Sequence, residues 1–268
     1  MSSLLVAAES EPPQHRVQFY GRNDDALAVN VSRYLGEGLQ RGEGLVVIAT
    51  AAHIRAFANR LGEDGRRPMR AIHEGRLVFL GAEETLSLFM IDGQPDRDNF
   101  RSAMGIVLRQ LRSKTGSREI RAYGEMVSLL WNAGNSAAAV RLEQLWNEVL
   151  SENGLQLFCA YQIDVFSKEF QAGVIDEILC AHTHLEPEGT NGDLHGAVSR
   201  AMSEVLGARA RELPWLTDSR PASWAILPKG ENTVLWIRDN LPEYADEILA
   251  RARGYYQNLC GAGPCPAM

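Results

Sequence analysis

The sequence predicts an α/β fold with a mainly parallel central sheet. Residues 16–20 (RVQFY) and 45–50 (LVVIAT) are apolar runs typical of strands, and the segment between them repeats apolar residues at helical spacing. Strand, helix and strand at this spacing form a βαβ unit with parallel strands and a right-handed crossover. Leu155–Tyr161 (LQLFCAY) is almost entirely apolar, as expected of a strand covered by helices on both faces.

The other elements of the first two-thirds follow from the same patterns. Asn135 or Ser136 can cap a helix whose apolar stripe includes Trp146, and Asn153 with Gly154 ends it. That stripe predicts that Trp146 is buried against Leu155–Tyr161. Further strands are predicted at 77–80 and 119–123, and further helices at 27–38, 51–61, 83–90 and 100–111.

The last third of the chain is predicted to mix helices with a hairpin. A helix begins near Phe170 and runs to residues 180–184 (CAHTH), and another covers 194–206. Residues 223–228 (SWAILP) and 233–238 (TVLWIR) are predicted as two strands joined by a four-residue connection. An amphipathic helix then runs from about Leu241 to Tyr255.

Several short sequence motifs in the middle of the chain resemble those of a known family. GEM, LLW, AGN, RLEQLWNE and FCAYQID occur in that order within 119–164, and ETLSLFM and DGQPD precede them. This pattern resembles the MEDS domain, the sensory domain of methanogens and methylotrophs, over residues 15–184. The resemblance implies a divergent RecA-like three-layer fold, related to circadian-clock ATPases of the KaiC type, and a ligand-sensing role in signalling or transcription.

The expected organisation follows from this resemblance and from composition. Residues 1–14 form a flexible tail, 15–185 a MEDS-like sensory domain, and 260–268 a second flexible tail. Residues 186–259 form an extension of helix, hairpin and helix that packs on the domain or on a partner.

The place where an ATPase of this type holds phosphate is altered. The segment FYGRNDDALAVN keeps one glycine, has no lysine, and places Asp24 and Asp25 at the start of a helix. Two carboxylates suit the helix dipole but repel a triphosphate. We therefore expect no enzymatic activity.

The net charge, the hydropathy and the cysteine content indicate which partners and which cellular compartment to expect. The net charge of −7 at pH 7 argues against general attraction to nucleic acid or anionic membranes. No apolar run reaches the length of a transmembrane helix, and the N-terminus lacks the basic start of a secretory signal. With only four cysteines, these features favour a reduced cytoplasm.

A ligand site is expected where parallel strands end. Two predicted strands end at Tyr20 and at Thr50. The turn with Asp24 and Asp25 follows the first strand, and Glu125 follows the strand predicted at 119–123. RecA-like connectivity implies that strand 119–123 lies beside the first strand, which brings Glu125 to Tyr20. The acidic mixture suits a small neutral or cationic ligand, although Glu125 is equally well explained as a hydrogen-bonded turn residue.

Histidines provide weaker candidates. His15 matches the MEDS pattern but stands at the opposite end of the first strand, where a buried, hydrogen-bonded histidine is the simpler interpretation. His182 and His184 are metal-compatible, but on one helix they point about 200° apart, so they do not share an ion unless the helix has ended; His195 could then contribute after a loop. We expect no metal and no other cofactor.

The leading hypothesis is a non-catalytic sensory or regulatory domain. It binds a small metabolite and signals to a separate partner protein, in transcriptional or two-component-type regulation. A homodimer or partner interface is expected on the last helix, through Tyr244, Ile248, Tyr255 and Tyr256. Two alternatives are a nucleotide-binding enzyme with a non-standard phosphate site and a protein-interaction scaffold built on a degenerate ATPase fold.

Overall fold

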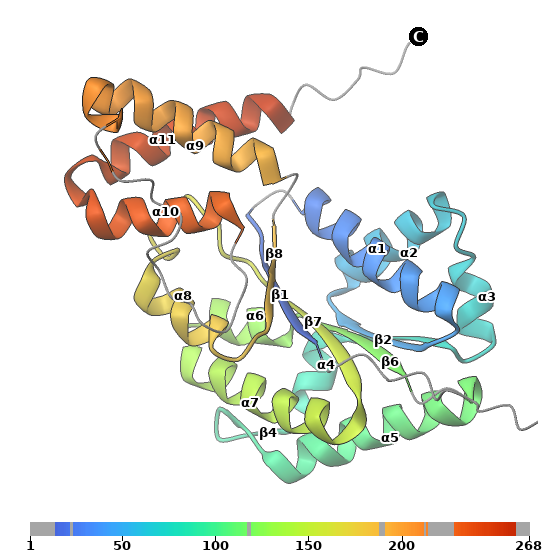
Figure 1. Cartoon of the computed structure of the whole chain (residues 1–268). Coiled ribbons are helices and arrows are strands. Elements are labelled where there is room, and N and C mark those ends of the chain that lie inside the picture. The colour runs from blue at the N-terminus through green and yellow to red at the C-terminus, as the bar shows by residue number, and fades with distance from the viewer. Residues whose placement is uncertain are drawn as a thin grey trace, which may run out of the picture.

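A six-stranded sheet, parallel throughout, runs through the centre of the molecule (Figure 1). The computed structural model describes residues 14–21, 24–116, 119–187, 191–211, 213 and 228–260. The strand order is β3-β2-β6-β7-β1-β8. The strands are β1 His15–Phe19, β2 Gly44–Ala49, β3 Leu77–Gly81, β6 Ile120–Gly124, β7 Leu155–Tyr161 and β8 His184–Glu186. A separate antiparallel pair is formed by β4 Met90–Ile91 and β5 Gln94–Pro95.

Helices cover both faces of this sheet, which confirms the predicted three-layer α/β fold. One face carries α1 Asp25–Arg41, α2 Ala51–Glu63 and α3 Pro68–His73. The other carries α4 Ala82–Ser87, α5 Arg97–Thr115, α6 Met126–Asn132 and α7 Ser136–Asn153. The chain continues through α8 Ala172–Leu179, α9 Asn191–Leu206, the 3-10 turn Gly207–Arg211, α10 Lys229–Asn240 and α11 Pro242–Cys260.

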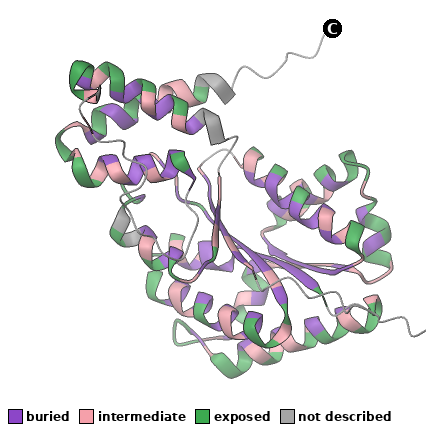
Figure 2. Ribbon diagram, in the orientation of Figure 1, coloured by how far each residue is buried: buried purple, intermediate pink, exposed green. Residues whose placement is uncertain are grey.

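Alternation along β7 separates two apolar cores. Phe158 packs toward α1, where its ring lies 5.5 Å from that of Tyr34. Its neighbours Leu157 and Cys159 belong to the core beneath α5 and α7. Because successive side chains point to opposite faces, the apolar run of β7 serves both cores at once, and Figure 2 shows the central strands almost wholly buried.

The predicted ends of α7 are confirmed. The Asn135 side chain accepts a hydrogen bond from the Ala138 amide at 3.1 Å, and Gly154 ends the helix with a positive φ of 61°. Trp146, on the apolar stripe between these ends, is 1% exposed, and its ring lies 5.0 Å from that of Phe100. The predicted burial of Trp146 is therefore confirmed.

The predicted neighbour of the first strand is wrong. β6 lies between β2 and β7, and β1 pairs instead with β7 and β8. Each βαβ crossover fixes the direction of a strand but not which neighbour it takes, so the order of strands did not follow from the sequence.

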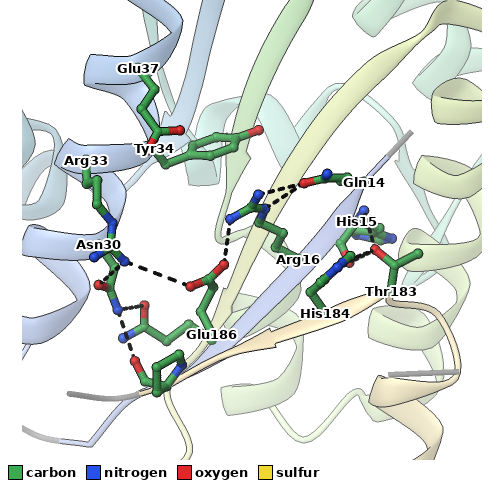
Figure 3. Close-up of polar contacts among 12 residues, drawn as sticks. Gln14, His15, Arg16, Asn30, Arg33, Tyr34, Glu37, Thr183, His184 and Glu186 are labelled. Carbon is green, nitrogen blue, oxygen red and sulfur yellow. Dashed lines mark hydrogen bonds and ion pairs between the residues drawn. The ribbon is translucent and has the colours of Figure 1, made fainter. Parts of the chain in front are cut away.

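The helix predicted to run from Phe170 to residue 184 is also wrong at its end. α8 stops at Leu179, and residues 184–186 form β8 on the free edge of β1. β8 supplies backbone hydrogen-bond partners to the edge of β1, which would otherwise be exposed. An ion pair of 2.7 Å between Arg16 on β1 and Glu186 on β8 also joins the two strands (Figure 3). The Asn30 side chain on α1 adds a hydrogen bond to the Pro187 carbonyl at 3.0 Å.

The predicted C-terminal hairpin is contradicted, because its second strand, residues 233–238, is part of the helix α10. Residues 223–227, most of its first strand, lie outside the described residues. A short apolar run such as TVLWIR suits a buried helix as well as a strand. In the structure Val234, Leu235 and Ile237 are all fully buried in the large core.

The three C-terminal helices pack together beyond the β8 edge of the sheet (Figure 1). Arg253 on α11 pairs with Asp164 at 2.8 Å, and Arg238 on α10 donates to the carbonyls of Phe166 and Ser167. The cationic group of Arg200 lies 3.9 Å from the centre of the Tyr255 ring. The contacts of Arg253 and Arg238 attach the last third of the chain to the segment that follows β7, and the contact of Arg200 with Tyr255 joins α9 to α11.

Most apolar residues of α11 pack against other residues of the same chain. Ile248 is fully buried, while Tyr244, Tyr255 and Tyr256 are half-buried. The Tyr256 ring contacts that of Phe166 at 5.8 Å. The expected homodimer or partner interface on this helix stays a prediction.

In the described part of the chain, no helix combines the length and the apolar character needed to cross a membrane.

Trp146→Ala should lower the free energy of unfolding by about 3–5 kcal/mol, because it removes a fully buried ring from the core beneath α5 and α7. Chemical denaturation measures this loss. Trp131→Ala is the matched control: Trp131 is half-buried, so its loss should be smaller. A loss below about 1 kcal/mol for Trp146→Ala would contradict the assigned helix face.

Candidate functional site

A pocket of about 170 Å³ opens where the four central strands β2, β6, β7 and β1 end. Tyr20 follows β1, Thr50 follows β2, Glu125 follows β6 and Gln162 follows β7. Carboxyl ends of parallel strands meet at one edge of a sheet, which is where open α/β sheets bind ligands. The other lining residues are Asp24, His53, Ser128, Leu129 and Asn132.

Glu125 is the centre of this pocket and is 2% exposed. Its Oε1 accepts a short hydrogen bond from the Thr50 backbone amide. Its Oε2 accepts one from the Tyr123 hydroxyl at 3.0 Å and lies 2.5 Å from Nδ1 of His53. A buried carboxylate is costly unless it is paired and hydrogen-bonded, and here both oxygens have partners.

His53 lies between two carboxylates. Its Nδ1 faces Glu125, and its Nε2 lies 3.0 Å from Oδ2 of Asp24. Its ring also stacks on Phe57 at 5.5 Å and meets the edge of Tyr20 at 5.8 Å. An imidazole with an acceptor at each nitrogen bonds to both only as the doubly protonated cation.

The pKa shifts agree with this geometry. Burial by itself lowers the pKa of His53, but hydrogen bonds to and charges on Glu125 and Asp24 outweigh it and raise that pKa above its usual value. Burial, with the charges of Glu125 and Asp24, raises the pKa of the Tyr20 phenol well above its ordinary range. The pocket therefore gathers a phenol, an imidazole whose proton affinity is raised, and the carboxyl groups of Asp24 and Glu125.

Three helices begin at this pocket. Asp24, Thr50 and Glu125 occupy the N-cap positions of α1, α2 and α6. The positive ends of helix dipoles favour negative charge, which helps to stabilise the two carboxylates here. The Asp24 side chain makes no capping hydrogen bond and turns to His53 instead.

The structure brings four of the predicted ligand residues together: Tyr20, Asp24, Thr50 and Glu125 line one pocket. Asp25 is the first residue of α1 and is not among the lining residues. His15 begins β1, at the opposite end of that strand. What the four residues bind stays a prediction.

Sequence reasoning missed His53, the only basic side chain among the described residues that line the pocket. Its signal was its place three residues after Thr50, in the first turn of a helix that starts where β2 ends. The sequence also did not single out Ser128, Leu129, Asn132 and Gln162 as lining residues. Ser128, Leu129 and Asn132 lie on α6, a helix the sequence did not predict.

His15 belongs to a second polar cluster, on the α7 side of the sheet. His15, Glu143, Cys159 and His182 are all buried, and one ligand-type atom from each lies within 4.8 Å of the others. Burial alone raises the pKa of Glu143, but His182 and His15 outweigh burial and hold that pKa well below its usual range. The expectation of a buried, hydrogen-bonded His15 agrees with its 2% exposure.

The weak metal candidates His182 and His184 lie on opposite faces of the sheet, and the helical angle between them is not the reason. Both lie beyond the end of α8, so the helical angle between them does not apply. His184 is registered with Arg16 in β8, so it shares the face of Arg16 and points away from the face of His15 (Figure 3). Its Nδ1 contacts the Thr183 hydroxyl at 2.9 Å.

Glu125→Gln should lower the pKa of His53, because the hydrogen bond to the Glu125 carboxylate and the charge of that carboxylate contribute most to raising it. The wild-type pKa should lie above the ordinary 6.5, measured by NMR titration of the imidazole carbon-bound proton. The stability that this shift contributes is fully present below pH 6.5 and is lost as the pH rises through the folded-state pKa. Glu63→Gln, at the far end of α2, is the control and should leave the titration unchanged. An unchanged pKa in Glu125→Gln would contradict the pairing.

One of three comparisons with known proteins gives a match, and it extends over residues 14–183. No curated protein and no solved structure matches the sequence. The sequence profile described as MEDS, the MEthanogen/methylotroph, DcmR Sensory domain, matches residues 14–183. The match includes β1 to α8, and with them every residue of the pocket at the strand ends. Because it extends over more than half of the 268 residues, the chain belongs to the MEDS family of sensory domains.

Proposed function

We propose that the protein is a non-catalytic sensory domain whose pocket at the strand ends binds a small neutral or cationic molecule. The observation that carries this proposal is the charge of the pocket: Glu125 and Asp24 are both paired with the single cation His53. Two carboxylates and one imidazolium leave a net negative charge, which favours a cation or a neutral hydrogen-bonding molecule over a phosphate.

Pocket size supports a small ligand. The volume of about 170 Å³ is below the roughly 300–1,000 Å³ of pockets that hold drug-sized molecules. Leu129 supplies an apolar surface, and Ser128, Asn132 and Gln162 supply polar groups. The Asn132 and Gln162 side chains already bond each other at 3.2 Å, so a ligand would join an existing network.

The position of the pocket supports a signalling role. A ligand that contacts Asp24, Thr50 and Glu125 touches the first residues of α1, α2 and α6 at once. Its binding free energy can therefore favour one arrangement of three helices over another, which is the requirement for a population shift. The shifted arrangement would be passed to a partner protein in transcriptional or two-component-type regulation.

The experiment begins with native mass spectrometry of freshly purified protein, which identifies any co-purifying small molecule and the number of subunits. Calorimetry with that molecule then compares wild type with Glu125→Gln. Loss of the charge should weaken binding by about 1.5–3 kcal/mol, a factor of roughly 10–150. Glu63→Gln is the control and should bind as wild type does.

A second measurement serves where nothing co-purifies. Thermal shifts are recorded with small amines, polyols and amides on one side and phosphorylated metabolites on the other. The proposal expects stabilisation within the first group only. Stabilisation by phosphorylated compounds alone, or unfolding of Glu125→Gln with no separable loss of binding, would contradict it.

The protein should not hydrolyse ATP. The segment between β1 and α1 has no phosphate-binding lysine, and the Asp24 carboxylate occupies the start of α1. Phosphate release should therefore equal that of a mock purification. Turnover above this background that Glu125→Gln abolishes would favour the nucleotide-enzyme alternative.

A further inference from the structure

Four buried side chains from distant parts of the sequence converge on the α7 side of the sheet. His15 comes from β1, Cys159 from β7, Glu143 from α7, and His182 from the loop between α8 and β8. Glu143 and Cys159 have no exposed surface, and the two histidines are 2–3% exposed. This cluster lies apart from the pocket at the strand ends and shares no residue with it.

The outer nitrogens of both imidazoles are held by acceptors. Nδ1 of His182 lies 2.6 Å from the Ile178 carbonyl, which only accepts, so Nδ1 carries a proton. Asn147 donates through Nδ2 to the Ala181 carbonyl at 2.9 Å, so its oxygen faces Nδ1 of His15 at 2.9 Å. Nδ1 of His15 therefore also carries a proton. Such hydrogen bonds on the far nitrogen are typical of histidines that bind a metal through Nε2.

With Nδ1 protonated, each imidazole can direct an Nε2 lone pair into the cluster when Nε2 carries no proton. Nε2 of His182 lies 3.3 Å from Oε1 of Glu143 yet makes no hydrogen bond, although it is buried. Nε2 of His15 lies 3.3 Å from both Oε2 of Glu143 and the Cys159 sulfur. The Tyr161 hydroxyl satisfies Oε1 at 2.8 Å, and among contacts of the described residues no arginine or lysine pairs with Glu143. When both Nε2 atoms are unprotonated, acceptors outnumber donors in this cluster, and a bound cation would balance the carboxylate.

Several spacings are close to the edges of a tetrahedral zinc site. Zinc bonds of about 2.0–2.3 Å to nitrogen, oxygen and sulfur place neighbouring ligand atoms about 3.3–3.6 Å apart. Oε2 of Glu143 lies 3.3 Å from Nε2 of His15 and 3.5 Å from the Cys159 sulfur, and these two lie 3.3 Å from each other. Nε2 of His182 lies 3.3 Å from the other oxygen, Oε1, and one ligand atom from each of the four residues lies within 4.8 Å of the others. Two imidazoles, a thiol and a carboxylate are ligands that suit zinc.

We propose that His15, Glu143, Cys159 and His182 bind one Zn²⁺ ion in a closed structural site. The ion replaces the thiol proton of Cys159, which leaves to solvent, and its two charges offset the thiolate and the carboxylate. Four ligands fill the tetrahedron, so the site has no open position for a substrate. It ties β1, β7 and α7 to the segment that enters β8. This departs from the sequence-based expectation of no metal.

Elemental analysis of the full chain, expressed with added zinc and desalted, should find about one zinc per chain. Cys159→Ser should lose the metal, and Asn147→Ala, which leaves all four ligands in place, should weaken zinc affinity about 10–100-fold in a chelator competition. His184→Gln and Cys180→Ser are the matched controls: a neighbouring histidine on the other face of the sheet and an exposed cysteine. Both should keep the zinc.

A titration with Co²⁺ tests the site in the wild-type protein, and so it does not depend on a variant that folds poorly. Metal-stripped wild-type protein is titrated with Co²⁺, and a thiolate-to-cobalt charge-transfer band should appear at one ion per chain and persist in Cys180→Ser. A rise in thermal midpoint on adding zinc should accompany it. Absence of zinc in the purified protein together with absence of the cobalt band would overturn the proposal, as would a band that survives Cys159→Ser. These outcomes leave the ligand pocket untested, so the two proposals fail separately.

Discussion

Two carboxylates buried away from water set the polar organisation of this fold. Glu125 and Glu143 are 2% and 0% exposed; Glu125 lies at the carboxyl edge of the sheet, and Glu143 lies on α7 against one face of it. Removing an ionised carboxylate from water is so unfavourable that its neighbours must supply charge and hydrogen bonds. Each glutamate accordingly gathers histidine and tyrosine side chains from other elements: His53 and Tyr123 around Glu125, and His15, His182 and Tyr161 around Glu143.

The parallel sheet carries these two assemblies in different places, and they share no residue. The pocket lies at its carboxyl edge, where strand ends, helix starts and the open side of the sheet coincide. The Glu143 cluster lies beneath α7, where side chains alternate inward from β1 and β7.

The edge strand β8 connects the family-specific part of the chain to the C-terminal helices. It begins directly after the matched residues 14–183 and pairs with β1 through residues 16–18. The helices α9, α10 and α11 then share one apolar core with the sheet face beneath α7. The extension is thus packed on the same body as the pocket, and contacts such as Arg253 with Asp164 join it to the segment after β7.

The sequence by itself determined the fold class, most elements and four residues of the pocket. Apolar periodicity located α7 and β7 and predicted the burial of Trp146, because the spacing of apolar residues along the chain reflects which faces of an element are buried. Tyr20, Asp24, Thr50 and Glu125 were found because parallel strands end at one edge whatever their order. Only the tertiary structure decided the strand order, the β8 edge, the helical state of residues 233–238, and the partners of the buried charges. Those depend on contacts between residues such as His15 and Glu143 or His53 and Asp24, which are far apart in the chain and leave no local pattern.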